Sequence, residues 1–189
     1  SGPSGSGKTT LCRRLADEDE AIYSTSCTTR PSRKGERDGH DYHFLTRETF
    51  EQKVTNGEFL EYAEVHGNLY GTLKTEVLDH LAKGIDVVMD IDVQGAAQVR
   101  SCADTSIKAA LVDVFVMPHT EDELLKRLTG RGSDSQDVIA LRMKNALGEI
   151  SHCPHYTYRL LSDTREQDYH QFKSLIIAER LKISRLEKP

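Results

Sequence analysis

The sequence predicts an α/β fold in which helices flank a central, mainly parallel sheet. Three observations point to it: a glycine-rich stretch that leads directly into a helical pattern, short apolar runs typical of buried strands, and helical segments that alternate with those runs. The 189 residues suffice for one domain with a buried core, and we expect small lobes inserted into it.

The elements of the first half follow from periodicity and turn residues. A helix after the glycine-rich stretch carries Leu11 and Leu15 at helical spacing. Residues 24–46 are polar and basic, with turn signals. We then expect a helix at 49–56, a hairpin at 58–72 that turns at Gly67-Asn68, and a helix at 73–83 that Gly84 ends.

The second half alternates strands and helices. Its apolar runs predict buried strands at 86–91, at 111–117 with Pro118 as its end, and at 158–161. Helical patterns occupy 95–100, 120–128, 138–150 and 166–186. Thr120 and Glu123 have the spacing of a capping box at the start of one of these helices.

Composition excludes several classes of protein. A net charge of −5 argues against a dedicated nucleic-acid or membrane surface. The four cysteines form no CxxC pair, which favours free thiols in a reducing cytosol over a disulfide framework or a zinc site. With neither an apolar run of about 18 residues nor a signal-peptide pattern, we expect a cytoplasmic protein.

The stretch GPSGSGKTT fits the phosphate-loop pattern G-x-x-x-x-G-K-[ST]. Glycines let successive N–H groups face an anion, and the helix that follows adds the positive end of its dipole. Lys8 would reach the β- and γ-phosphates of a nucleotide, and the Thr9 hydroxyl would bind Mg²⁺. The alternative is a glycine-serine linker that matches by chance. The predicted ATP-binding residues here are Gly2, Ser4, Gly5, Ser6, Gly7, Lys8, Thr9 and Thr10.

This loop normally follows a central strand, yet only Ser1 precedes Gly2. We therefore expect the first strand to be absent from the chain as given.

A second phosphate-binding stretch is indicated by Arg30, Arg33 and Arg37, because the planar guanidinium suits bidentate phosphate contacts. Tyr42 and Tyr70 offer hydroxyl groups to the same phosphate. A solvated basic turn is the alternative.

Four segments after the loop carry a family resemblance: SxTTRxxRxGExxGxDYxF at 26–44, GxFLEYAxxxGxxYGT at 57–72, MDIDVQGA at 89–96 and LxxRLxGRGxxS at 124–135. In this order they resemble the guanylate kinases, which move a phosphoryl group from ATP to GMP. The resemblance covers essentially the whole chain. It implies a P-loop kinase fold with a core at 1–25, 74–119 and 150–189, a small, mostly β GMP-binding lobe at 26–73, and a helical lid at 120–149.

The resemblance implies that guanine is held by Ser26, Glu61, Thr72 and Asp92. It also implies that Arg30, Arg33, Tyr42 and Tyr70 hold the phosphate of GMP, with Glu36 beside the arginines. Glu61 makes chemical sense, because an ionised carboxylate accepts from the adjacent N1–H and N2–H₂ of guanine, whereas adenine has an unprotonated N1. An exposed strand residue is the alternative for Glu61.

Asp90 and Asp92 follow an apolar strand on one face, and Asp90 is predicted to help Thr9 hold Mg²⁺. A capping role is the alternative for Asp90. The resemblance places Arg127, Arg131 and Arg142 in or near a lid over ATP, with Arg127 and Arg131 as ATP-binding residues. Arg127 as an exposed helix residue is the alternative. The residues predicted to stabilise phosphoryl transfer are Lys8, Arg30, Arg33, Arg131 and Arg142.

The chain departs from the family at Ser162-Asp163-Thr164, where an Asn-Asp-Asp turn is common near adenine. Serine offers one donor where the asparagine amide offers two, so we expect weak selectivity among ATP, GTP and CTP. Expected partners are ATP, GMP and dGMP, with neither nucleic acid nor membrane, for a monomer or weak homo-oligomer. Rival interpretations are another small-molecule kinase, a non-catalytic protein-binding module, and a GTPase.

Overall fold

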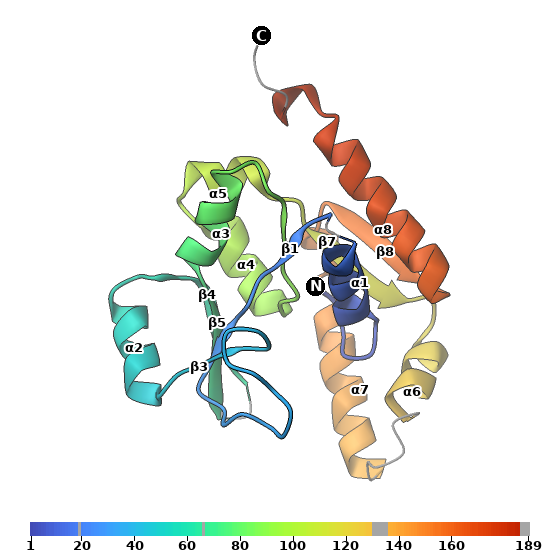
Figure 1. The fold of residues 1–189 in the computed structure, drawn as a ribbon. Helices are drawn as coiled ribbons and strands as arrows, with labels where there is room; N and C mark the ends of the chain where they lie inside the picture. Colours follow the sequence, from blue (N-terminus) through green and yellow to red (C-terminus); the bar gives the residue numbers. More distant parts are fainter. Residues whose placement is uncertain (19, 66, 130–135, 186–189) are drawn as a thin grey trace. The chain divides into compact units, whose positions relative to one another are not determined.

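The computed structural model describes residues 1–18, 20–65, 67–129 and 136–185. Its contacts separate two compact units (Figure 1). The terminal unit comprises Ser1–Leu15 and Val112–Pro189, and the middle unit is Ala16–Leu111. The division into core, lobe and lid stays a prediction.

The sheet of the terminal unit is built on two parallel strands, β7 (Val114–Pro118) and β8 (Tyr158–Ser162). Ser1 extends it: its amino group donates to the Val114 carbonyl, and its own carbonyl accepts from the Val116 N–H, each at 2.8 Å. This is the bonding pattern of a parallel neighbour. The α/β prediction is therefore confirmed for this unit.

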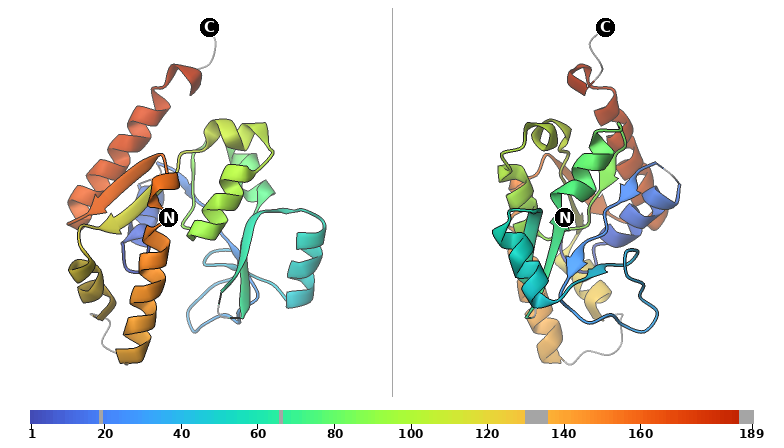
Figure 2. Two further views of the ribbon diagram at one scale, coloured as in Figure 1. Left: turned by 180° about the vertical axis from the view of Figure 1, so that it is seen from behind. Right: turned by 60° about the vertical axis from the view of Figure 1, so that its left-hand side comes forward.

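Helices surround this sheet, as the ribbon seen from behind shows (Figure 2). Leu124, Leu128 and Ala146 pack two of them together. Thr120 caps one by accepting the Glu123 N–H at 3.2 Å, which confirms the predicted start. The helices are α1 (Lys8–Asp17), α6 (Glu121–Thr129), α7 (Gln136–Ile150) and α8 (Arg165–Arg180), with 3₁₀ turns at Cys153–His155 and Ile183–Arg185.

The middle unit contains a mixed four-stranded sheet in the order β3-β2-β5-β4 and a parallel pair, β1 with β6. The predicted hairpin is present as the antiparallel strands β4 and β5. The strands are β1 (Ile22–Tyr23), β2 (Cys27–Thr28), β3 (His43–Phe44), β4 (Phe59–Val65), β5 (Asn68–Leu73) and β6 (Val87–Val88); the helices are α2 (Arg47–Thr55), α3 (Lys74–Leu81), α4 (Val93–Ser101) and α5 (Thr105–Ala110).

The structure differs from the sequence prediction in two elements of this unit. The strand expected at 86–91 is shorter and consists of β6 alone. Met89 and Ile91, which follow it, have no regular secondary structure, and their side chains pack against a buried cluster that includes Leu60 and Val77. Helix α5 was not expected, because its six residues are too few for a periodic pattern. It is started by Asp104, whose carboxylate accepts two N–H groups of the first turn.

Strand β4 is an outer strand of the mixed sheet. The Gln98 side chain on α4 covers it: the amide oxygen accepts the Tyr62 N–H at 3.0 Å, and the amide nitrogen donates to the Tyr62 carbonyl at 2.7 Å. Both outward-facing backbone groups of Tyr62 are thus hydrogen-bonded.

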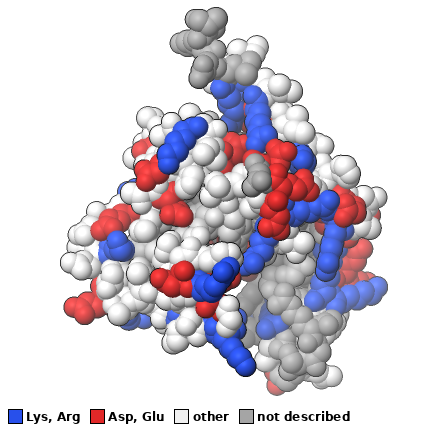
Figure 3. All heavy atoms as spheres, in the orientation of Figure 1, with Lys and Arg blue, Asp and Glu red and all other residues white. Residues whose placement is uncertain are grey.

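Basic and acidic side chains are interspersed on the face drawn in Figure 3. All four cysteines are free thiols, and burial raises the pKa of Cys27 to about 11. No helix within the described ranges has the length and apolar character needed to cross a bilayer.

Candidate active site

The start of the glycine-rich loop lies against the middle of β7. A Cβ added at Gly2 would lie 1.9 Å from the Val116 carbonyl oxygen, and Gly2 has φ +141°, so only glycine fits there. The turn that follows is closed by the Ser6 N–H, which donates to the Pro3 carbonyl. The Lys8 Nζ folds back over the loop and donates to the carbonyls of Gly2 at 2.6 Å and Pro3 at 3.0 Å.

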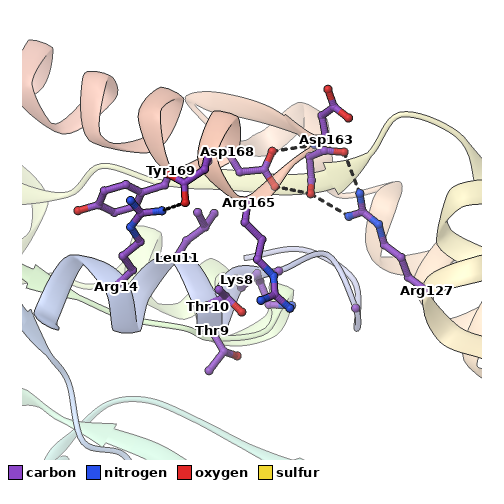
Figure 4. A pocket seen from close by; sticks show the side chains of 14 residues that line it. Lys8, Thr9, Thr10, Leu11, Arg14, Arg127, Asp163, Arg165, Asp168 and Tyr169 are labelled. Atoms are coloured by element: carbon purple, nitrogen blue, oxygen red, sulfur yellow. Dashed lines mark hydrogen bonds and ion pairs between the residues drawn. The ribbon is translucent and has the colours of Figure 1, made fainter. Parts of the chain in front are cut away.

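A pocket of about 520 Å³ opens beside this loop, entirely within the terminal unit (Figure 4). The loop and the first turns of α1 form one wall, and the end of β8 with the start of α8 forms another. Crevices where strands end and helices begin are the usual ligand sites of α/β sheets. The pocket is lined by Gly5, Gly7, Lys8, Thr9, Thr10, Leu11, Arg14, Arg127, Ser162, Asp163, Arg165, Glu166, Asp168 and Tyr169.

Three polar side chains of this pocket form a continuous hydrogen-bonded chain. Arg127 Nη1 donates to Ser162 Oγ at 2.8 Å, and Nη2 donates to the Ser162 carbonyl at 3.0 Å. Ser162 Oγ donates in turn to Asp168 Oδ2 at 2.6 Å. The Asp168 carboxylate also accepts the Asp163 N–H at 2.7 Å.

The wall opposite Arg127 combines an aromatic ring with cations. The Arg14 guanidinium lies 4.0 Å from the centre of the Tyr169 ring and donates to Glu166 at 2.8 Å. Figure 4 shows the Arg165 side chain between these residues and Arg127, reaching toward Lys8 and Thr9. The pocket therefore combines hydroxyl, carboxylate and guanidinium groups with one stacking surface.

The structure brings some of the predicted ATP-binding residues together and not others. Gly5, Gly7, Lys8, Thr9, Thr10 and Arg127 line the pocket, whereas Gly2, Ser4 and Ser6 support the loop outside the lining. Arg131 lies outside the described residues. Arg142 is half-buried on α7 and is not a lining residue.

The sequence did not single out Arg14, Arg165, Asp168 or Tyr169 as lining residues. The sequence could have indicated them only by their place in the chain, because they lie on the helices that follow the loop and the last strand.

A buried carboxylate marks a second site, in the middle unit. Glu61 on β4 is 5% exposed and faces Thr72 across the hairpin, where Thr72 Oγ1 donates to Glu61 Oε1 at 2.7 Å. Ser26 Oγ lies 3.4 Å from the same Thr72 hydroxyl. Burial raises the pKa of Glu61 above its ordinary value; the charge of Asp92 adds to this effect, and the bond from Thr72 opposes it.

The first turn of α4 closes over Glu61. Asp92 caps this helix, accepting the Gly95 N–H at 2.8 Å. A Cβ added at Gly95 would lie 2.6 Å from Glu61 Oε2, so any larger residue would displace the carboxylate or the helix. Four predicted guanine-binding residues, Ser26, Glu61, Thr72 and Asp92, are thus gathered around one buried acidic group.

The predicted phosphate-binding residues form a neighbouring group. The Glu36 carboxylate accepts hydrogen bonds from both Nη atoms of Arg30, at 3.1 and 2.8 Å, and from the backbone N–H of Arg33 at 2.7 Å. The bonds from Arg30 lower the pKa of Glu36. The Arg30 guanidinium lies over the Tyr42 ring, which meets the Tyr70 ring edge-on at 6.0 Å. Tyr70 and Thr72 alternate along β5, so their side chains share a face and connect the two groups.

The predicted metal ligands, Thr9 and Asp90, belong to different units. Their hydroxyl and carboxylate oxygens are the donors that Mg²⁺ prefers. Across the residues described, no three or more His, Cys, Asp or Glu side chains are arranged to hold a metal ion. In kinases Mg²⁺ needs only one or two protein oxygens, because the phosphates and water complete its shell. Thr9 and Asp90 each offer an oxygen of the kind that suits a magnesium ion bound together with a nucleotide.

Comparison with known proteins identifies the family. The guanylate kinase family model matches residues 1–179. The chain is 44% identical to a guanylate kinase of Syntrophotalea carbinolica over 98% of this chain and 87% of that protein. It is 47% identical to one of Sphingopyxis alaskensis, over 96% and 81% of the respective chains. A crystal structure of guanylate kinase from Anaplasma phagocytophilum superposes with a TM-score of 0.77 at 33% identity, covering 94% of this chain and 85% of that one. The chain therefore belongs to the guanylate kinase family, the nucleoside monophosphate kinases that transfer a phosphoryl group from ATP to GMP.

Proposed function

We propose that the pocket beside the phosphate loop binds Mg·ATP and that the two residue groups of the middle unit bind GMP or dGMP. The chain then produces ADP and GDP or dGDP within purine nucleotide metabolism. The observation that carries this proposal is the buried Glu61 carboxylate, which accepts from Thr72 on β5, while Tyr70 on the same strand β5 belongs to the arginine-tyrosine group. The free thiols support a cytoplasmic location.

Guanine would be read by the Glu61 carboxylate. Thr72 occupies one lone pair of Oε1, which leaves acceptor capacity for the adjacent N1–H and N2–H₂ donors of guanine. Adenine would bring an acceptor nitrogen toward a buried anion, and this unpaired contact would exclude it. The remaining predicted guanine contacts come from Ser26, Thr72 and Asp92.

The phosphate of GMP would bind the other group. Arg30 and Arg33 supply guanidinium groups, and Tyr42 and Tyr70 supply hydroxyl donors. Glu36 would act as a positioning residue, because it orients Arg30 through two hydrogen bonds before any ligand arrives. A preoriented arginine loses less freedom when the phosphate binds.

On the donor side, the Lys8 Nζ would leave its two carbonyl partners and bind the β- and γ-phosphates. Thr9 and Asp90 would hold Mg²⁺, which would supply positive charge to offset the negative charge that develops on the phosphates. Arg30, Arg33, Arg131 and Arg142 would stabilise the transferring phosphoryl group. The acceptor is already an anion, so the reaction needs positioning and charge stabilisation rather than a general base.

The test is ADP production from Mg·ATP with GMP, dGMP, AMP, CMP, UMP and dTMP in parallel. Turnover with GMP and dGMP alone is the expected result. Preference for another monophosphate would contradict the assignment of Glu61, and inactivity with all six would contradict the proposed activity.

Replacing Gly95 by alanine should weaken GMP binding specifically. The added Cβ would meet Glu61 Oε2 at 2.6 Å and displace the carboxylate that reads the base. We expect the KM for GMP to rise about tenfold, the loss of roughly one charge-assisted hydrogen bond. Gly148→Ala is the matched control, because that helical glycine has nothing within 4 Å of an added Cβ. Equal KM values for GMP in the two variants would contradict the role of Gly95.

Donor selectivity should be weak. The hydrogen of the Ser162 hydroxyl is already donated to Asp168, so this side chain cannot donate to the base of the donor nucleotide. We expect kcat/KM values for ATP, GTP and CTP within about one order of magnitude, since one unmade neutral hydrogen bond is worth roughly 1 kcal/mol. Sharp selectivity for ATP would refute this prediction.

A further inference from the structure

Two buried polar side chains, Ser162 and Asp168, meet at the wall of the loop pocket. Ser162 is the last residue of β8 and is 2% exposed; Asp168 lies in the first turn of α8 and is 6% exposed. A buried carboxylate is rarely tolerated unless its oxygens are hydrogen-bonded. Here one oxygen accepts the Ser162 hydroxyl at 2.6 Å, and the other accepts the Asp163 N–H at 2.7 Å.

The direction of these hydrogen bonds is fixed by chemistry. A guanidinium only donates, so Ser162 Oγ must accept from Arg127. The one hydroxyl hydrogen is therefore left for Asp168, as the short distance indicates. The two hydrogen bonds therefore link the positive Arg127 guanidinium to the negative Asp168 carboxylate through the Ser162 hydroxyl. Figure 4 shows Arg127 and Asp168, the two ends of this chain, with the hydrogen bonds drawn as dashed lines.

We infer that Asp168 is a positioning residue for donor-nucleotide binding, acting through Ser162 on the Arg127 guanidinium. The inference rests on the proposed use of the loop pocket by the donor triphosphate. Arginine side chains lose considerable rotamer freedom when they bind a ligand, and an arginine fixed in advance loses less. Ser162, at the position where the family commonly has asparagine, thus orients Arg127 in this chain.

The experiment measures KM for ATP, KM for GMP and kcat in Asp168→Ala, Arg127→Ala and the double variant. For Asp168→Ala we expect the KM for ATP to rise about tenfold, as for one hydrogen bond to a charged group, with KM for GMP unchanged. For Arg127→Ala we expect at least as large a rise. The double variant should match Arg127→Ala alone, because Asp168 acts only through Arg127.

Glu179→Ala is the matched control. Glu179 is the other buried carboxylate near the opposite end of α8, 4% exposed, and it accepts the hydroxyl of Tyr158 on β8. Loss of either carboxylate should lower the melting temperature, but only loss of Asp168 should raise the KM for ATP. Asp168→Asn provides a second variant of the same shape if the alanine variant does not fold; its amide oxygen can still accept from Ser162, so we expect a smaller rise.

The outcomes separate this inference from the proposed function. If Arg127→Ala raises the KM for ATP while both Asp168 variants leave it unchanged, the inference is overturned and the donor pocket stands. If Asp168→Ala and Glu179→Ala raise it equally, the effect is only structural and the inference is again overturned. If Arg127→Ala leaves the KM for ATP unchanged, Arg127 has no part in donor binding and the inference is overturned, whereas the proposed function fails only if the original chain is inactive with all six monophosphates.

Discussion

Replacing Lys8 by alanine is expected to lower kcat by about three orders of magnitude, the scale found when one cationic group that stabilises a phosphoryl transfer is removed. The proposed reaction has no general base, so charge stabilisation carries most of the rate. In the structure the Lys8 Nζ donates to two carbonyl oxygens of its own loop, and these weaker acceptors are readily exchanged for phosphate.

GMP binding should survive this change, because the predicted GMP-binding residues all belong to the middle unit and Lys8 belongs to the terminal unit. Single-turnover kinetics with ATP and calorimetric titration with GMP would measure the two effects separately. Lys74→Ala is the control: Lys74 also donates to a backbone carbonyl, that of Gly57, and should change neither quantity. Loss of GMP affinity in the Lys8 variant would count against separate donor and acceptor sites.

Replacing Glu61 by glutamine should lower the activity with GMP and raise the unfolding free energy. The amide would present a donor where the carboxylate offers an acceptor, and guanine would lose one or both of its paired contacts. We expect kcat/KM for GMP to fall by about two to three orders of magnitude, as for two hydrogen bonds to a charged group. The kinetics with GMP at fixed ATP measure this loss.

The same substitution should change the pH dependence of stability. Burial raises the pKa of Glu61 above its ordinary value of about 4.5. Protonated Glu61 therefore favours the folded state, and this contribution is complete below the ordinary pKa and is lost as pH rises through the raised value. Glutamine never ionises, so the unfolding free energy of Glu61→Gln relative to the original chain should increase across that window.

Denaturant unfolding at a series of pH values would measure this difference. Glu64→Gln is the matched control, because Glu64 lies on the same strand, β4, with an exposed side chain paired to Arg47. It should show no comparable increase with pH. A difference for Glu61→Gln that stays constant with pH would contradict the raised pKa.

Local chemistry made part of this molecule predictable from sequence. The phosphate loop lies in consecutive residues, and its glycines, Lys8 and Thr9 identify it without knowledge of the fold. The hairpin was predictable because its strands alternate around a recognisable turn at Gly67. Strands of two residues such as β1 and β6 were not, since they are too short for any periodic pattern.

Contacts between distant segments explain what the sequence could not predict. Arg127 meets Ser162 across 35 positions of the chain. Gly95 approaches Glu61 only because the first turn of α4 packs beside β4. The sequence identified Ser162 as a departure from the family and treated its hydroxyl as available to a base, whereas the structure commits that hydroxyl to Asp168.

The amide of Gln98 on the outer strand β4 bears on how this chain behaves at high concentration. An uncovered strand edge is a template on which another polypeptide can add a strand, which leads to domain swapping or fibrils. At Tyr62 the Gln98 amide already makes the two backbone hydrogen bonds that one residue of a neighbouring strand would make. An incoming strand would have to displace Gln98 and α4 before it could pair there. The outer strand that carries Glu61 is therefore closed to strand addition at Tyr62.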